Sequence, residues 1–313
     1  MRWIATALGR RVARGVLWPI ALYFLIFGGA AARASRDYLE RVLGRPPRWV
    51  ERYRHIHHFA ATVLDRVYLL MGQLHHFDLQ VRGMDAFDAA LLDGEGVLLI
   101  GAHLGSFEAL RAIGRQRHGL RIAMVMYEDN ARQINATLQA IAPEAALHVI
   151  PLGRLEAMLQ LREWLDGGGV AGMLGDRTLP GSAQRSHSHV LDFLGRPAPF
   201  SDGPFRLAAL LRRQVLFMTG LYQGRAGYEL RFVPLADFRE RPANAAAQDA
   251  AIRAALARYV ALLEGLCRES PYNWFNFFDF WAGAKATGPQ AVPPAAAPAA
   301  HDPDSSAHAA RPS

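Results

Sequence analysis

The 313-residue chain is 51% hydrophobic and carries a formal net charge of +7, almost all of it from arginine, because Lys285 is the only lysine. Such a chain can bury the core of one large domain or two small ones, and its positive charge suits an anionic membrane surface or phosphorylated or acidic substrates. No nucleic-acid-binding module is recognisable, and the single cysteine, Cys267, excludes an intrachain disulfide and an all-cysteine zinc site.

The first predicted element is an uncharged apolar run over residues 15–32, which arginines flank on both sides. The run just reaches the length of a membrane-spanning helix, and Pro19 lies near its start, where a helix tolerates proline best. Two alternatives stay open: an amphipathic helix in the membrane interface, and a cleaved signal peptide with the A-x-A pattern of residues 32–34. We expect residues 1–36 to form a membrane-anchor helix with its basic flank.

A helical stretch over residues 35–79, broken at Pro46 and Pro47, is followed by alternating short strands and helices. The expected strands are residues 79–82, 97–100, 121–126, 148–150, 170–174, 190–194, 215–222 and 228–233. The expected helices are residues 85–92, 107–117, 131–141, 155–165, 203–211 and 244–267. This alternation predicts an α/β domain over residues 37–283, with a mixed central sheet flanked by helices.

Residues 284–313 differ in composition from the rest of the chain. They contain six prolines and eleven alanines, and Val292 is their one large aliphatic residue. A segment of this kind cannot bury a core, so we expect a disordered Pro/Ala-rich tail.

The most informative motif is GVLLIGAHLGSFE at residues 96–108. His103 follows an apolar strand, at the edge where open α/β sheets bind ligands, and Glu108 opens the next helix. If the turn folds back, Glu108 holds the imidazole of His103, and the pair is the base half of a triad whose nucleophile is a substrate hydroxyl. The spacing alone leaves open a surface or packing role for His103 and a helix-capping role for Glu108.

Charged residues accompany two other predicted strands at the same edge of the sheet. Arg154 comes after residues 148–150, and Asp176 and Arg177 come after residues 170–174. Arginines in such places bind a phosphate or a carboxylate, or stabilise an oxyanion. A local ion pair or turn at Asp176 and Arg177 is the alternative.

A cluster of histidines, His55, His57 and His58 with His75 and His76, is the second conspicuous group. A metal site needs converging ligands, and there is neither an HExxH pattern nor a nearby carboxylate pair, so we favour a polar helix face and expect no metal. The chain also lacks a Gly-x-Ser-x-Gly elbow, a Walker loop and a dinucleotide fingerprint. A serine-hydrolase interpretation is therefore weak, and we expect no cofactor.

Taken in order, these blocks resemble the lysophospholipid-acyltransferase superfamily, and in particular the lipid A biosynthesis acyltransferases, the lauroyl and myristoyl transferases of Gram-negative bacteria. The resemblance covers residues 1–281. It is carried by the N-terminal apolar run, the His-x4-Glu block ending at Glu108, MVMYEDN at residues 124–130, Arg154, Gly-Asp-Arg at residues 175–177, and Phe-Leu-Gly-Arg-Pro-Ala at residues 193–198. Single short motifs are weak, but their order and spacing are specific.

The resemblance implies an O-acyltransferase in which His103 is the general base and Glu108 its partner. It implies substrate-binding roles for Gly105, Ser106, Asn130, Arg154, Asp176 and Arg177. The donor it implies is an acyl thioester on acyl carrier protein or coenzyme A, and the acceptor is a hydroxyl group of a lipid or lipid-like molecule. Family members retain the N-terminal segment and work at the cytoplasmic face of the bacterial inner membrane, which disfavours a cleaved signal peptide.

Two departures from the lipid A branch concern the acceptor. Glu128 and Asp129 stand in the second block, where that branch is more basic, and the ending PYNWFNFFDFW at residues 271–281 looks more like acyltransferases encoded with aryl-polyene and polyketide-like synthases. An acyltransferase for an aryl polyene or another specialised lipid is therefore one alternative. A membrane-tethered, non-catalytic lipid-binding protein and a metal-dependent hydrolase built on the histidine cluster are alternatives of other classes.

Overall fold

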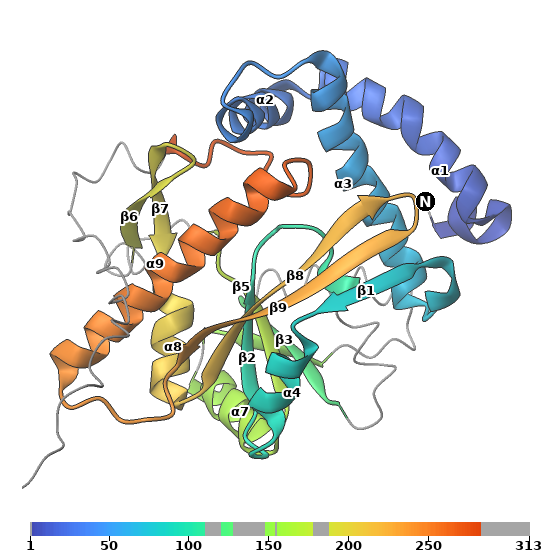
Figure 1. Cartoon of the computed structure of the whole chain (residues 1–313). Helices are drawn as coiled ribbons and strands as arrows, with labels where there is room; N and C mark the ends of the chain where they lie inside the picture. Colours follow the sequence, from blue (N-terminus) through green and yellow to red (C-terminus); the bar gives the residue numbers. More distant parts are fainter. Residues whose placement is uncertain (1, 110–119, 128–147, 154, 178–187, 283–313) are drawn as a thin grey trace, which may run out of the picture.

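A seven-stranded mixed sheet lies at the centre of the computed structural model, which describes residues 2–109, 120–127, 148–153, 155–177 and 188–282 (Figure 1). In spatial order its strands are β1 (Asp78–Arg82), β9 (Gly227–Asp237), β8 (Gln214–Gly224), β2 (Val97–Gly101), β5 (Val170–Leu174), β3 (Ile122–Tyr127) and β4 (His148–Leu152). The strands from β8 to β4 are parallel to their neighbours, whereas β9 is antiparallel to β8 and β1 is parallel to β9. The expected α/β fold with a mixed sheet is confirmed.

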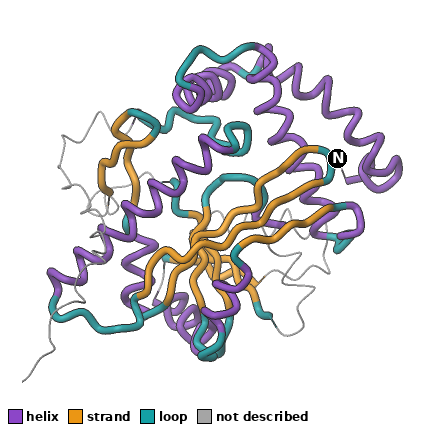
Figure 2. Tube along the Cα trace, in the orientation of Figure 1, coloured by secondary structure: helices purple, strands orange, loops and turns teal. Residues whose placement is uncertain are grey.

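Helices flank this sheet, as the purple tubes of Figure 2 show. They are α1 (Arg2–Phe27), α2 (Gly29–Leu43), α3 (Trp49–Leu70), α4 (Met84–Leu91), α7 (Leu155–Asp166), α8 (Gly203–Leu211) and α9 (Ala245–Glu269), with a 3-10 turn at Leu74–His76. The break expected at Pro46 and Pro47 is confirmed, because both prolines lie between α2 and α3. Of the expected helix at 107–117 only residues 107–109 are described, and the expected helix at 131–141 and tail at 284–313 lie outside the described residues.

A separate two-stranded hairpin joins β6 (Ser188–Phe193) to β7 (Arg196–Ser201). The sequence predicts the first strand but not the second. Pro197 and Pro199 explain the omission, because proline supplies no N–H to a ladder and is tolerated only in edge positions such as this small hairpin offers.

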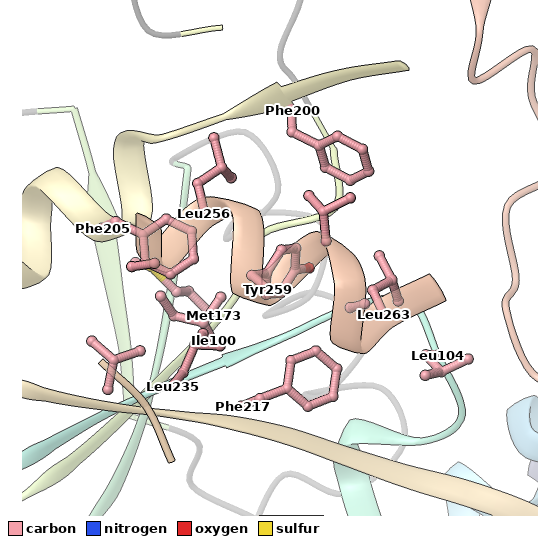
Figure 3. Close-up of a cluster of buried hydrophobic side chains, with 14 of the residues drawn as sticks. Ile100, Leu104, Met173, Phe200, Phe205, Phe217, Leu235, Leu256, Tyr259 and Leu263 are labelled. Atoms are coloured by element: carbon pink, nitrogen blue, oxygen red, sulfur yellow. The ribbon is translucent and has the colours of Figure 1, made fainter. Parts of the chain in front are cut away.

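The strand before His103 is buried on both faces, which explains its unbroken apolar run. Leu98 and Ile100 belong to the hydrophobic core that includes α8 and α9, where Ile100 lies among the labelled side chains of Figure 3, such as Phe205 and Tyr259. The alternate residues Val97 and Leu99 belong to a second core, which includes α3 and α4. Packing on both faces fixes the strand, and with it the position of the residues that follow it.

The apolar run expected to form one anchor helix is divided between α1 and α2 at Gly28. A Cβ at this position would lie 2.2 Å from the Phe24 carbonyl oxygen, so the tight bend requires glycine. Among the described residues no single helix is both long and apolar enough to cross a membrane. The pair Gly9–Phe27 and Gly29–Leu43 meets that criterion only as a unit bent by 92°.

Buried polar contacts hold α1 against the body of the protein, where it packs along α3 (Figure 1). Nε of Arg10 lies 2.9 Å from Oδ1 of Asp65, whose side chain is fully buried on α3. Tyr228 donates to the other oxygen of Asp65 at 3.0 Å, and Arg14 donates to the Tyr222 hydroxyl at 2.5 Å. An unpaired buried charge is costly, so the buried carboxylate of Asp65 must keep these partners. The contacts therefore hold α1, α3 and the adjoining end of strands β8 and β9 in fixed positions relative to one another.

Candidate active site

His103 and Asp176 come from neighbouring strands of the sheet. Strands β2 and β5 pair in parallel, with Gly101 opposite Leu174, and each of the two residues lies two positions beyond the end of its strand. The Gly175 N–H donates to the Gly101 carbonyl at 2.9 Å, which extends this register into the loops. Since the carboxyl ends of parallel strands meet at one edge, the two side chains are brought together.

The carboxylate of Asp176 accepts three N–H groups. Nδ1 of His103 lies 2.8 Å from Oδ1, and the His103 backbone N–H and the Trp274 indole N–H each donate to Oδ2 at 3.0 Å. Burial raises the pKa of Asp176, but the positive charge that His103 carries when protonated and the hydrogen bonds from these donors outweigh it and lower the pKa below its ordinary value. Because an ionised carboxylate only accepts, Nδ1 of His103 carries the proton, and Nε2 is the nitrogen that can take one up.

Glu108 does not make the expected contact with the imidazole. Its Oε1 lies 2.7 Å from Nε of Arg66 on α3, and its Oε2 accepts a hydrogen bond from the Ser106 hydroxyl at 3.3 Å. The charge-assisted pair with Arg66 directs this carboxylate towards α3, while Nδ1 of His103 is taken by Asp176. The expected pairing is therefore corrected: the carboxylate on the imidazole is that of Asp176, a residue that the resemblance assigns to substrate binding.

The turn after His103 is closed by backbone hydrogen bonds. The Gly105 N–H donates to the Asn273 carbonyl and the Ser106 N–H donates to the Gly220 carbonyl, both at 2.8 Å. Because both amides are used in this way, the expected substrate-binding role of Gly105 and Ser106 is not carried by their backbone N–H groups.

We expect Gly105→Ala to destabilise the protein far more than Gly195→Ala. Both glycines have a positive φ, +78° and +76°, so both substitutions strain the backbone. A Cβ at Gly105 would also lie 2.0 Å from the Gly220 carbonyl oxygen, whereas nothing lies within 4 Å of a Cβ at Gly195. The clash should add about 2 kcal/mol or more to the loss of unfolding free energy, measured by chemical denaturation. Equal losses in the two variants would contradict this account.

A cavity of about 340 Å³ adjoins His103. Its polar lining comprises His103, Glu108, Arg66 and Arg177, together with Ser106 and Thr62. Its apolar lining includes five phenylalanines, Phe59, Phe107, Phe275, Phe277 and Phe278. A space with charged groups on one part and aromatic rings on another fits a substrate with a polar and a hydrocarbon part.

Arg177 lies at this cavity, and its side chain is held by the segment after α9. Its guanidinium lies 5.2 Å from the centre of the Phe278 ring and donates to the Phe275 carbonyl at 3.5 Å. The structure thus brings Arg177 together with His103 and Asp176. Asn130 and Arg154, the other two predicted substrate-binding residues, lie outside the described residues.

The histidine cluster is divided among different environments. His55 is fully buried between the Ser35 hydroxyl and the Trp274 carbonyl, and burial lowers its pKa to about 4. Burial, followed by the neighbouring charge of His57, lowers the pKa of His58 to about 3. Within the described part of the chain no three His, Cys, Asp or Glu side chains are grouped to hold one metal ion.

Two features of this site are not visible in the sequence. The contact of Asp176 with His103 depends on β2 and β5 being neighbours, although β3 and β4 lie between them in the chain. His103 and Asp176 each closely follow a predicted strand, which is a signal in the sequence, but it is useful only once the two strands are known to be neighbours. Trp274 lies nearly a hundred positions from Asp176 in sequence, and no spacing rule connects them.

Comparison with known protein families identifies a match that covers most of the chain. The profile of the family described as bacterial lipid A biosynthesis acyltransferase matches residues 1–281. No curated protein sequence matched the chain.

Proposed function

The chain belongs to the bacterial lipid A biosynthesis acyltransferase family, and from that premise we propose that it is a membrane-associated O-acyltransferase with His103 as its general base. It moves a fatty-acyl group from a thioester, on acyl carrier protein or coenzyme A, to a hydroxyl group of a lipid acceptor of the lipid A type. Asp176 holds the imidazole, and the cavity beside His103 receives the reacting groups.

The reaction follows from the position of the imidazole proton. Nε2 of His103 takes the proton of the acceptor hydroxyl as its oxygen attacks the thioester carbonyl carbon. The tetrahedral intermediate then collapses, the C–S bond breaks, and the imidazolium returns the proton to the leaving thiolate. An ester and a free thiol result, with no acyl-enzyme. The ionised Asp176 stabilises the imidazolium between the two proton transfers.

One observation carries this proposal: the 2.8 Å contact between Nδ1 of His103 and Oδ1 of the buried Asp176, beside a cavity. A histidine used only for packing needs no carboxylate held by three N–H donors. The contact fixes the tautomer and leaves Nε2 as a base, which is what removal of a hydroxyl proton near neutral pH requires.

The cavity lining supports the proposed substrate class. Phe59, Phe277 and Phe278 offer a surface to the acyl chain, and Arg177 is a cation for an anionic group on the acceptor or the donor. Asn130 and Arg154 keep their predicted role in substrate binding.

Association with the inner membrane is part of the proposal, with the catalytic domain at the cytoplasmic face, where acyl thioesters are available. We define the N-terminal apolar surface as the exposed side chains Trp18, Leu22, Tyr23, Ile26, Phe27, Trp49 and Val50 of α1 and α3. Trp18, Phe27 and Trp49 are each more than 60% exposed. Aromatic residues of this kind are favoured at the membrane interface.

The distribution of charge also supports binding of the membrane through the N-terminal apolar surface. Residues 1–54 contain eleven arginines and three acidic residues, a net charge of +8 against +7 for the whole chain. An apolar surface within such a basic segment suits a bilayer with anionic lipids, to which each arginine near the surface adds attraction.

We expect the double variant Trp18→Glu and Trp49→Glu to bind anionic phospholipid vesicles at least about tenfold more weakly than the wild type, because it loses two interfacial aromatic rings and gains two repelled charges. Co-sedimentation of the full chain with phosphatidylglycerol-containing vesicles measures the effect. Leu92→Glu is the matched control, since Leu92 is 82% exposed but lies at the end of α4. Equal binding by the double variant and the control would refute docking through this surface.

The activity itself is tested with the purified full chain, a defined acyl thioester and a bacterial lipid extract. Mass spectrometry should detect acceptor lipids heavier by one acyl group, with one free thiol released per ester formed. If neither acyl carrier protein nor coenzyme A thioesters give such an ester, the proposed activity is wrong. Binding of lipid without turnover would favour the non-catalytic alternative.

A further inference from the structure

The segment that follows α9 lies across the His103 turn. Leu104 and Trp274 form an antiparallel bridge, and the Phe275 N–H donates to the His103 carbonyl at 2.7 Å. The Trp274 side chain is fully buried. The segment therefore forms part of the wall that holds the histidine.

We propose that Trp274 is a positioning residue that aligns His103 by fixing Asp176. The proposal rests on the proposed function of His103 as the base. The Trp274 indole N–H and the His103 backbone N–H converge on Oδ2 of Asp176, each at 3.0 Å. With Oδ2 held at two points, Oδ1 is left for Nδ1 of the imidazole at 2.8 Å.

Removal of the indole N–H would leave the carboxylate with one donor on Oδ2. The Asp176 side chain is 1% exposed, so solvent is poorly placed to replace the lost donor. The carboxylate is then freer to rotate about its Cβ–Cγ bond, and the imidazole, which is 29% exposed, follows it. The consequence is a misaligned base rather than a lost binding contact.

Trp274 is itself fixed by a second hydrogen-bonded chain. Nε2 of His55 lies 2.8 Å from the Trp274 carbonyl oxygen, and Nδ1 of His55 lies 2.8 Å from the Ser35 hydroxyl. A carbonyl only accepts, so Nε2 carries the proton and Nδ1 accepts from Ser35. The low pKa of His55, about 4, keeps this arrangement unchanged at neutral pH. The backbone of Trp274 is thus anchored to α2 and α3.

The packing of the indole ring does not depend on its N–H group. Tyr38, Phe193 and Phe280 surround it, with ring centres 5.0 to 5.3 Å away. Phenylalanine at position 274 keeps an aromatic ring among these neighbours and removes the donor to Asp176.

Trp281→Phe is the matched control for Trp274→Phe. Trp281 is also buried, belongs to the same segment and the same hydrophobic core, and donates its indole N–H to the Phe193 carbonyl at 3.3 Å instead of to Asp176. Both substitutions remove the same atoms, so the cost of lost packing is similar in the two variants.

The test is steady-state acyl transfer by the full chain. We expect Trp274→Phe to lower kcat by about tenfold or more, with KM changed less than about twofold, because a hydrogen bond to a charged group is lost behind the base. Trp281→Phe should keep kcat within about twofold of the wild type, and both variants should melt within a few degrees of each other. Equal kcat losses in the two variants, or a wild-type kcat in Trp274→Phe, would overturn the proposal.

A second readout does not require activity. In ¹⁵N-histidine-labelled protein, the Nδ1–H resonance of His103 is identified as the signal missing from His103→Gln. We expect Trp274→Phe to shift this signal and to speed its exchange with water, whereas Trp281→Phe leaves it in place. If the wild type shows no acyl transfer, the proposed function fails, and this measurement still decides whether Trp274 positions His103. An unchanged signal in Trp274→Phe would refute the positioning role.

Discussion

Replacement of His103 by alanine is expected to lower kcat/KM for acyl transfer by about a hundredfold or more, because the proposed reaction then has no group to remove the proton of the acceptor hydroxyl. The imidazole is the one side chain at the cavity that is held by the buried Asp176 in the part of the chain that the structure describes. Donor binding should change little, since the acyl chain and its carrier are expected to contact other residues. Initial rates at several thioester concentrations separate the two effects.

The control for this variant is His103→Gln. Alanine leaves Oδ1 of Asp176 without its donor, which can destabilise the site, whereas the glutamine amide can still donate an N–H to that oxygen. Both variants should lose activity to a similar degree, because an amide is not a base at neutral pH. Near-normal turnover in either variant, with an unchanged melting temperature, would exclude His103 as the base.

The strands of the sheet are predictable because their burial leaves a direct trace in the sequence. β5 and α8 have the expected bounds, and β2, buried on both faces, is extended by one residue. The hairpin strand β7 was not expected, since Pro197 and Pro199 are unfavourable for a strand on propensity alone. In each case the deciding factor is local, either the pattern of apolar residues or the presence of proline.

The sequence does not show which residues become neighbours in the folded protein. Glu108 is close to His103 in the chain, so a contact between them is the natural prediction. In the fold, Glu108 contacts Arg66 from α3, and His103 contacts Asp176 from the loop after β5. Both contacts join residues that are dozens of positions apart, and they follow from the order of strands and the packing of α3.

The structure of the N-terminal apolar run also depends on features that its composition does not reveal. Its composition predicts an apolar segment correctly, but composition does not contain the bend at Gly28 that divides it between α1 and α2. The contacts of Arg10 with Asp65 and of Arg14 with Tyr222 then hold α1 against the rest of the protein. Such long-range polar contacts have no periodicity by which they could be recognised.

Whether Asp176 or Glu108 is the carboxylate partner of His103 can be decided with the variant Asp176→Asn. We expect this variant to lose kcat on the order of a thousandfold. Two N–H groups, from the His103 backbone and Trp274, point at the Oδ2 position, so the asparagine oxygen must occupy it. Its NH₂ group then takes the Oδ1 position and donates to Nδ1 of His103. The imidazole proton is forced onto Nε2, which can no longer act as the base.

Glu108→Gln is the matched comparison, and we expect it to cost less than about tenfold in kcat, because the pair it breaks with Arg66 is partly exposed and does not involve the imidazole. Double variants with His103→Ala sharpen the distinction. Asp176→Asn should add almost nothing once the imidazole is gone, whereas the cost of Glu108→Gln should multiply with that of His103→Ala. If Glu108→Gln instead matches Asp176→Asn and is silent beside His103→Ala, then Glu108 is the partner of the base during catalysis, and the carboxylate must exchange Arg66 for His103 when substrate binds.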